Sequence, residues 1–362
     1  MNAKPVAETI GQAFDRAGGR SSGFDYLRLG LASAVLFWHS FRVTDVSIGY
    51  ESWWGPLVRL ILPMFFALSG FLVAGSLLRV RSMREFLILR TLRIMPALWV
   101  VVAVSVLGIG LAFTTLPAGD YLAHPQTRDY FWNLVARTRY LLPGVFRDNP
   151  VEVINASLWT IRYEIQAYIL IVVLWIVGAI KRPRLLLPLV LVGQLLAPAI
   201  DLISTVPVRE AGPVSGYTLI VSFTFGTVLF VCRDLVPARN SWGIASGVLA
   251  LALLSTHASG YFAGPAAAYF TVWLGLKNPQ RNFVVASADI SYGIYLWAYP
   301  IQQAVVQLFP GARIWWANAA ISFAITVVIA TLSWHFVEKP VLDGRKRVIA
   351  WSDRLAARFA RG

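Results

Sequence analysis

The sequence predicts an all-α, polytopic integral membrane protein with about ten transmembrane helices. Of its 362 residues, 57% are hydrophobic and only 14% are charged, which is too apolar for a soluble domain of this size. Apolar runs close to the ~20 residues needed to cross the hydrocarbon core recur along the chain. Because lipid offers backbone groups no hydrogen-bond partner, we expect these runs to be helices.

The predicted spans follow one another with short connections. They cover 26–44, 57–78, 92–115, 157–180, 184–204, 215–232, 242–258, 260–276, 288–309 and 315–336. With the N-terminus inside, 23 of the 32 Lys and Arg residues lie on the inner side and eight on the outer side. Cytoplasmic loops retain basic residues, so this bias predicts that both termini are cytoplasmic.

One membrane domain, residues 23–340, is predicted to lie between two tails. Residues 1–22 are polar and show no apolar core before a small-residue cleavage site, so we expect a mobile cytoplasmic tail and no signal peptide. Residues 341–362 alternate basic and apolar side chains, which predicts an amphipathic cytoplasmic helix on an anionic lipid surface. The longest outer segment, 117–156, is rich in proline and aromatic residues and predicts a packed cap at the interface.

Charge and cysteine content limit the possible functions. The formal net charge is +14, but the basic residues lie mainly between apolar spans, which favours a topological role over nucleic-acid binding. The single cysteine, Cys232, excludes an internal disulfide and a multi-cysteine metal site. We expect no metal.

His39 is an ionisable residue in an otherwise apolar run that begins at Leu27. Such residues persist in hydrocarbon where they act chemically or are well paired. Arg28 lies eleven positions earlier, which on a helix places it on the same face to within about 20° and ~16 Å below His39. A structural histidine bonded to a neighbouring helix is the alternative, and the aligned arginine favours function.

Three further charged residues are candidates for a site. Arg90 and Arg93 lie one turn apart at the inner start of a span, where two guanidinium groups could bind phosphates; arginines flanking a span are also ordinary topological signals. Glu164 lies near the predicted depth of His39 and could orient the imidazole and raise its basicity. The alternative for Glu164 is an ion pair with an arginine on another helix.

Six motifs occur in one order along residues 24–343. They are Phe24–Arg28 with His39–Ser40, Phe65–Leu72, Arg90–Pro96, Ser157–Tyr168, Ile290–Trp297 and Phe336–Pro340. In these motifs the chain resembles the membrane-bound acyltransferase family 3, whose bacterial members O-acylate surface and secreted sugars. One departure is clear: Ala298 follows Trp297, where many members have a histidine, so the resemblance implies no second catalytic histidine at this position.

The resemblance implies transfer of an acyl group, often acetyl, from cytoplasmic acyl-CoA to a hydroxyl of an extracytoplasmic or lipid-linked carbohydrate. It implies that His39 is catalytic, that Arg90 and Arg93 act on the donor side, and that Glu164 is the motif's acidic residue. The pantetheine arm of the donor is expected to rise along the face between Arg28 and His39. The expected partners are a carbohydrate or glycolipid acceptor and membrane lipids, in a bacterial inner membrane.

Two questions stay open at this point. His39 could act as a general base on the acceptor hydroxyl or as a nucleophile that forms an acyl-histidine. A glycan or lipid transporter is the rival function, because intramembrane His, Arg and Glu also mark transport paths, although the chain shows no internal repeat of the kind many transporters carry. A structural membrane subunit would explain the spans but not the buried His and Glu.

Overall fold

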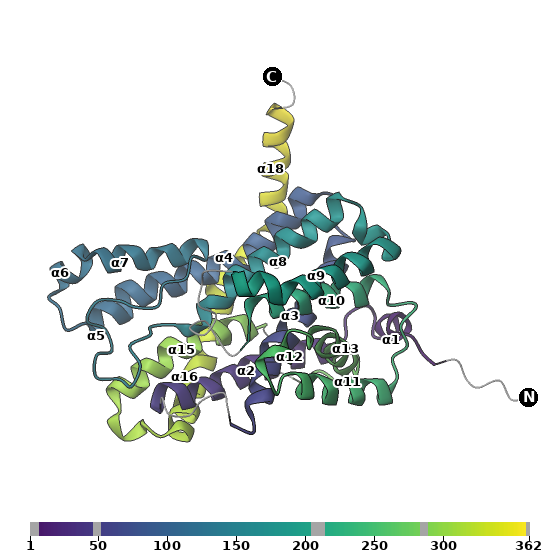
Figure 1. Ribbon diagram of the computed structural model, residues 1–362. Coiled ribbons are helices and arrows are strands. Elements are labelled where there is room, and N and C mark those ends of the chain that lie inside the picture. The colour runs from purple at the N-terminus through teal and green to yellow at the C-terminus, as the bar shows by residue number, and fades with distance from the viewer. Residues whose placement is uncertain (1–6, 46–51, 204–213, 283–288, 360–362) are drawn as a thin grey trace, which may run out of the picture. The chain divides into compact units, whose positions relative to one another are not determined.

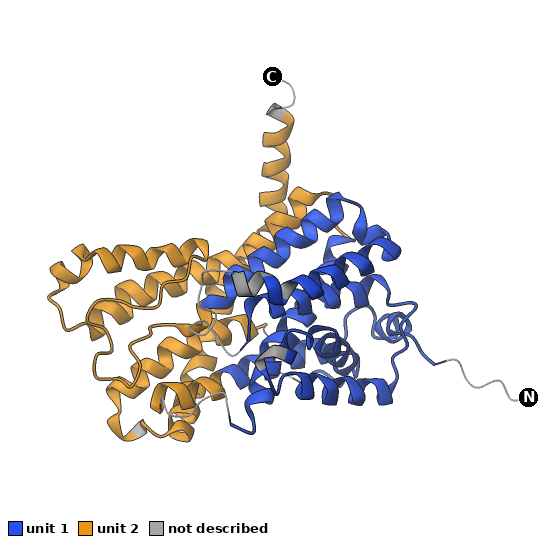
Figure 2. Cartoon of the chain, viewed as in Figure 1, with its two compact units in different colours: residues 1–35, 49–78, 159–287 blue, residues 36–48, 79–158, 288–362 orange. Residues whose placement is uncertain are grey.

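A computed structural model describes residues 7–45, 52–203, 214–282 and 289–359, and its regular elements are helices (Figure 1). In these ranges β-type pairing is limited to the isolated bridges Thr9–Pro237 and Thr114–Val145. The predicted all-α class is therefore confirmed. The chain divides into two compact units, residues 1–35, 49–78 and 159–287 in the first and 36–48, 79–158 and 288–362 in the second (Figure 2).

The first unit holds most of the apolar helices. They are α1 (Ile10–Arg16), α2 (Ser22–Thr44, which continues into the second unit), α3 (Gly55–Leu77), α8 (Trp159–Ile176), α9 (Pro183–Ile203), α10 (Gly216–Val231), α11 (Asn240–Leu253), the single turn α12 (His257–Gly260) and α13 (Gly264–Gly275). Hydroxyl groups begin several of these helices: the Ser215 side chain accepts from the Tyr217 N–H at the start of α10, which satisfies one of the unpaired donors of a helix N-terminus.

Small residues set the closest helix contact of the first unit. A Cβ atom on Gly70 of α3 would collide with the Phe223 carbonyl oxygen of α10, and one on Gly226 of α10 would collide with the Ala67 carbonyl oxygen of α3. The Thr227 hydroxyl donates to the Gly70 carbonyl at 3.3 Å across the same contact. Small residues at helix crossings are typical of membrane helices, because backbones can then approach closely.

The N-terminal segment corrects one prediction. The sequence predicts a mobile tail over residues 1–22, whereas the structure has the helix α1 there, with Ile10 and Phe14 buried. A capping box formed by Thr9 and Gln12 begins the helix, and the Phe14 ring packs edge-on against Phe71 with centroids 5.5 Å apart. The buried apolar face holds this short helix against the first unit, although the segment 1–22 is polar in overall composition. Its cytoplasmic location stays a prediction.

The second unit contains the longest helix run and the outer segment. Its helices are α4 (Met83–Val104), the π-helix η1 (Ser105–Gly110), α5 (Leu111–Phe113), α6 (Ala118–Ala123), α7 (Pro125–Tyr130), the 3₁₀ turns η2 (Phe131–Val135) and η3 (Ala156–Leu158), α15 (Ser291–Leu308), the 3₁₀ turn η6 (Pro310–Ala312), α16 (Trp315–Ser333), the π-helix η7 (Trp334–Glu338), α17 (Lys339–Asp343) and α18 (Arg345–Phe359).

The segment 117–156 is packed onto the second unit. Tyr121 and Tyr130 are fully buried, and the Tyr121 hydroxyl donates to the Val106 carbonyl at 2.9 Å. Burial raises the pKa of Tyr121 to about 12, so this hydroxyl stays protonated and available as a donor. The packed cap is thus confirmed as a structure, and its position outside the membrane stays a prediction.

Each of the ten predicted spans overlaps at least one described helix. Four described stretches are long and apolar enough to cross a membrane by length and composition: Gly55–Leu77, Met83–Phe113, Ala156–Ile176 and Trp315–Ala357. Pro183–Leu196, Gly216–Val231 and Asn240–Leu253 are shorter apolar helices. The membrane character is supported, and the number of ten crossings stays a prediction.

Candidate active site

His39 lies in the last third of α2 and faces α15. The imidazole and the Tyr299 ring make a T-shaped contact with centroids 4.9 Å apart and planes at 83°. The Nδ1 atom is buried, and no residue that the structure describes forms a hydrogen bond with it. A buried imidazole nitrogen without a protein partner is costly for stability alone, so this geometry favours a chemical role over the structural alternative.

A buried polar network holds the α2 turn that carries His39. The Gln302 side chain of α15 donates to the Leu36 carbonyl at 2.8 Å and to the Ser40 hydroxyl at 2.6 Å. The Asn318 side chain of α16 donates to the Gln302 carbonyl at 3.1 Å. All three polar side chains are fully buried. Three helices of the second unit are therefore bonded together around the residue next to His39.

Arg90 and Arg93 lie one turn apart on α4, as the sequence predicts. The Arg90 guanidinium lies 5.8 Å from the centroid of the Phe86 ring. The Arg93 guanidinium forms ion pairs with Asp289 at 2.7 Å and with Glu338 at 3.4 Å. Because two carboxylates already share the charge of Arg93, less of that charge is available to an anionic ligand. The phosphate-binding role of both arginines stays a prediction.

Glu338 links the end of α16 to α4. Its side chain is 2% exposed, forms an ion pair with Arg93 of α4 and accepts a hydrogen bond from the Ser333 hydroxyl. The π-helix η7, Trp334–Glu338, ends at this residue. A π-turn rotates the side chains that follow it around the helix axis, relative to an uninterrupted α-helix. No local sequence pattern predicts that rotation, so the direction of Glu338 could not be predicted from the sequence.

Glu164 and Arg28 belong to the first unit. The Glu164 carboxylate accepts a hydrogen bond of 2.6 Å from the Tyr168 hydroxyl one turn further along α8. Arg28 is half-buried on α2, three positions after Asp25. His39 belongs to the second unit, so its expected pairing with Glu164 stays a prediction.

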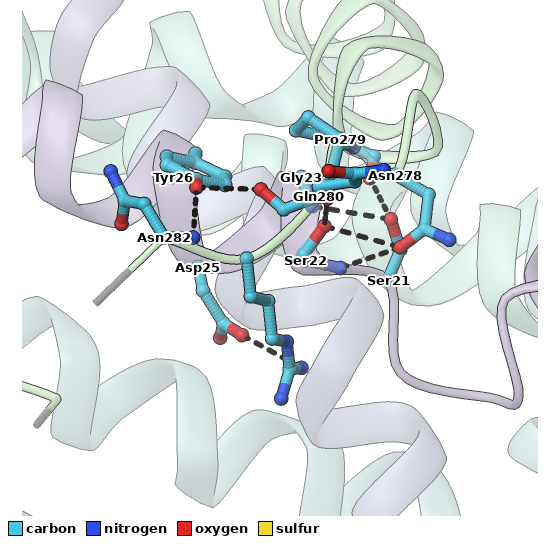
Figure 3. Close-up of polar contacts among 11 residues, drawn as sticks. Ser21, Ser22, Gly23, Asp25, Tyr26, Asn278, Pro279, Gln280 and Asn282 are labelled. Carbon is cyan, nitrogen blue, oxygen red and sulfur yellow. Dashed lines mark hydrogen bonds and ion pairs between the residues drawn. The ribbon is translucent and has the colours of Figure 1, made fainter. Parts of the chain in front are cut away.

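The start of α2 is bonded to the segment after α13 (Figure 3). The Tyr26 hydroxyl donates to the Gln280 carbonyl and accepts from the Asn282 N–H, each at 2.8 Å, and Asp25 pairs with Arg281 at 3.2 Å. The Ser22 side chain contacts Asn278 and Pro279 in the same place (Figure 3). These bonds fix the first turns of α2, which contain the motif Phe24–Arg28, against the segment 278–282. His39 lies three to four turns further along the same helix.

Three residues of this site, Asp289, Tyr299 and Gln302, were not predicted from the sequence. Asp289 precedes the motif Ile290–Trp297, and Tyr299 and Gln302 follow it. The available signal was the polarity of Gln302 and its neighbour in an otherwise apolar span, since buried amides need partners. Among the described residues no group of three or more His, Cys, Asp or Glu side chains could hold a metal ion.

The sequence of the chain matches a known protein family. The chain matches the Acyltransferase domain family over residues 21–336, and it therefore belongs to this family of acyltransferases. This confirms the resemblance drawn from the six motifs.

Three curated relatives are similar along much of the chain. "Nodulation protein 10" of Rhizobium leguminosarum bv. viciae is 26% identical, over 94% of this chain and 98% of its own length. The "O-acetyl transferase" of Shigella phage Sf6 is 24% identical, over 89% and 96%. The "Peptidoglycan O-acetyltransferase OatA" of Listeria monocytogenes serovar 1/2a is 26% identical over 77% of this chain, which matches half of that longer protein. No solved structure matches the chain.

Proposed function

We propose that this protein is a membrane O-acyltransferase that moves an acyl group, most simply acetyl, from acyl-CoA to a carbohydrate hydroxyl outside the membrane. The observation that carries the proposal is His39, held edge-on by Tyr299 with a buried Nδ1, in a chain that belongs to an acyltransferase family. Two relatives are named as O-acetyltransferases, one of them for peptidoglycan. Family membership favours acyl transfer over the transporter and the structural subunit.

In the proposed reaction His39 removes the proton of the acceptor hydroxyl as its oxygen attacks the thioester carbonyl. The C–S bond breaks, the acyl group stays on the acceptor oxygen as an ester, and the CoA thiolate takes the proton back from the imidazolium. The alternative route forms an acyl-histidine first and passes the acyl group to the hydroxyl in a second step. Glu164 stays the proposed residue that orients the imidazole.

The donor is proposed to enter from the cytoplasmic side. Arg90 binds a CoA phosphate, with Arg93 beside it, and the basic inner loops attract the anionic donor. Arg28 flanks the arm that carries the thioester towards His39. The proposed location is a bacterial inner membrane, with membrane lipids around the apolar helices and a carbohydrate or glycolipid as acceptor.

Labelled acetyl-CoA tests the reaction type directly. Membrane vesicles containing the protein are supplied with acetyl-CoA that carries a radioactive acetyl group, and the carbohydrate fraction is then treated with mild alkali. We expect label that alkali releases as acetate, because O-esters are cleaved under these conditions, and we expect none in vesicles without the protein. Label accumulating inside the vesicles without ester formation would instead support the transporter.

A further inference from the structure

The outer segment Asn149–Ser157 is bonded along its length to α15 of the same unit. The Gln303 side chain donates to the Val151 carbonyl at 2.7 Å and the Val153 carbonyl at 2.6 Å. The Asn149 side chain donates to both carbonyl groups of Gln303, in the backbone and in the side chain, at 3.0 Å each. Gln303 and Asn149 are both buried and therefore cannot bond to bulk water. These hydrogen bonds satisfy polar groups that would otherwise be costly to bury.

A proline in α15 creates a further attachment point. Pro300 lies inside the helix and has no N–H to offer the carbonyl of Leu296, four positions earlier. The Asn155 side chain donates to that carbonyl at 2.9 Å. The Tyr295 hydroxyl donates to the Ser157 carbonyl at 3.1 Å. The proline thus leaves the Leu296 carbonyl without its usual helical donor. Asn155 of the outer segment supplies a donor in its place, as a buried carbonyl requires.

The same segment reaches the surroundings of His39. Val153 and Ala156 pack against the cluster of Val43, Tyr299 and Val306. Tyr299 carries the ring that contacts His39, and Val43 lies one turn after His39 on α2. The segment therefore packs against the same cluster that contributes the Tyr299 ring to the surroundings of the imidazole.

Three charged residues in and next to this segment are exposed. Arg147 and Glu152 are exposed and pair loosely at 3.5 Å, and Asp148 between them is also exposed. Charged and amide side chains of this kind hydrogen-bond the hydroxyl groups of a polar ligand. An exposed ion pair of this kind adds little to stability. Its side chains can therefore exchange their mutual contact for hydrogen bonds to a ligand.

We propose that Asn149–Ser157, anchored by Gln303, is the acceptor-side wall of the His39 site and positions the carbohydrate whose hydroxyl is acylated. The inference rests on the proposed function and adds a specificity element to it. Gln303 acts as a positioning residue through the segment. Glu152 contacts the acceptor directly.

The anchor is tested with Gln303→Met, which keeps the length of the side chain and removes its polar groups. Gln307→Met is the matched control, because Gln307 is one turn further along α15 and its Oε1 has no hydrogen-bond partner in the described structure. Hydrogen exchange of purified protein in lipid nanodiscs measures amide protection over 149–157. We expect Gln303→Met to lower that protection at least about tenfold, since two backbone carbonyls lose their donor, and Gln307→Met to leave it unchanged.

Activity and donor binding are measured on the same variants. Activity is the ester-linked acetate that mild alkali releases from the surface polysaccharide of a host strain lacking its own copy of the protein. Donor binding is the affinity of the nanodisc protein for acetyl-CoA. We expect Gln303→Met to lower the acetate at least about tenfold, in line with the loosened wall, while the affinity for acetyl-CoA stays within about twofold.

Glu152→Ala keeps the proposal falsifiable if Gln303→Met fails to fold. Its ion pair is exposed, so folding should be unaffected, and we expect at least about threefold less acetate with normal acetyl-CoA affinity. Asp129→Ala, an exposed carboxylate elsewhere in the outer segment, is the control that should change neither. The proposed wall would be rejected if Glu152→Ala gave as much ester-linked acetate as the unmodified protein. It would also be rejected if Gln303→Met did so although amide protection over 149–157 was lost. Absence of acetate with the unmodified protein would instead reject the proposed function, and the wall's role with it.

Discussion

Arg90 and Arg93 carry the same charge one turn apart, but their surroundings differ. Arg93 forms ion pairs with Asp289 and Glu338, whereas the Arg90 guanidinium lies 5.8 Å from the centroid of the Phe86 ring. A guanidinium already shared by two carboxylates has less charge available for a phosphate. We therefore expect the proposed donor binding to depend more on Arg90 than on Arg93.

Arg90→Ala should weaken the binding of acetyl-CoA by about tenfold or more, because a charge-assisted hydrogen bond to phosphate is lost. Arg90→Lys should recover only part of the affinity, since an ammonium group cannot bind a phosphate in the forked manner of a guanidinium. Equilibrium binding to protein in nanodiscs measures both. Arg79→Ala, which removes an exposed inner-side arginine, is the control for general electrostatic attraction. Equal losses of acetyl-CoA affinity in Arg90→Ala and Arg79→Ala would show that Arg90 contributes only general positive charge and makes no specific phosphate contact.

Glu338→Gln should lower the free energy of unfolding by about 1.5 kcal/mol, because a buried hydrogen bond to a charged group is weakened while Asp289 still pairs with the Arg93 guanidinium. Asp353→Asn breaks the comparable ion pair with Arg84 at 2.6 Å, but both side chains there are about half exposed, and the loss should stay within about 0.5 kcal/mol. The midpoints of thermal unfolding in one detergent compare the two. A Glu338→Gln protein as stable as Asp353→Asn would show that the buried pair does not hold α4 in place.

At the scale of whole elements, hydropathy predicted the helices well because it is a local property. Every predicted span overlaps a described helix, and the basic tail forms the predicted helix α18. Partner choice is not local. Arg93 meets Asp289 and Glu338 across 196 and 245 positions of the chain, and Tyr299 reaches His39 from another span, so neither contact has a sequence signal. Helix α1 was missed because a composition-based view of a polar segment overlooks a capping box and two buried apolar residues.

The α3–α10 contact gives a test at the element scale. Gly70→Ala and Gly226→Ala each place a methyl group against a backbone carbonyl of the partner helix, and backbone cannot move aside as a flexible side chain can. Each variant should lower the unfolding midpoint in detergent, by an amount equivalent to about 1–3 kcal/mol. Gly193→Ala in α9 is the control, because nothing lies within 4 Å of its added Cβ. Normal stability in both test variants would mean that the two helices pack less closely than described.

At the scale of the whole molecule, the central prediction is the orientation in the membrane. Cys232 is the single cysteine and is first replaced by serine. One new cysteine is then placed at the exposed Asp129 of the outer segment and, separately, at the exposed Ala350 of α18. A membrane-impermeant thiol reagent added to intact cells should label Asp129→Cys and miss Ala350→Cys, since basic residues mark the cytoplasmic side. Labelling of Ala350→Cys alone would invert the topology.

In the proposed reaction one imidazole carries out the chemistry while the rest of the chain positions donor and acceptor. The most direct measurement compares the unmodified protein with His39→Ala in a host strain that lacks its own copy. Its readout is the ester-linked acetate that mild alkali releases from surface polysaccharide, at matched levels of protein in the membrane. We expect the unmodified protein to restore the acetate and His39→Ala to lower it by about a hundredfold or more, in the range expected for loss of a general base or nucleophile. Normal acetate from a membrane-inserted His39→Ala protein would show that His39 is not the catalytic residue.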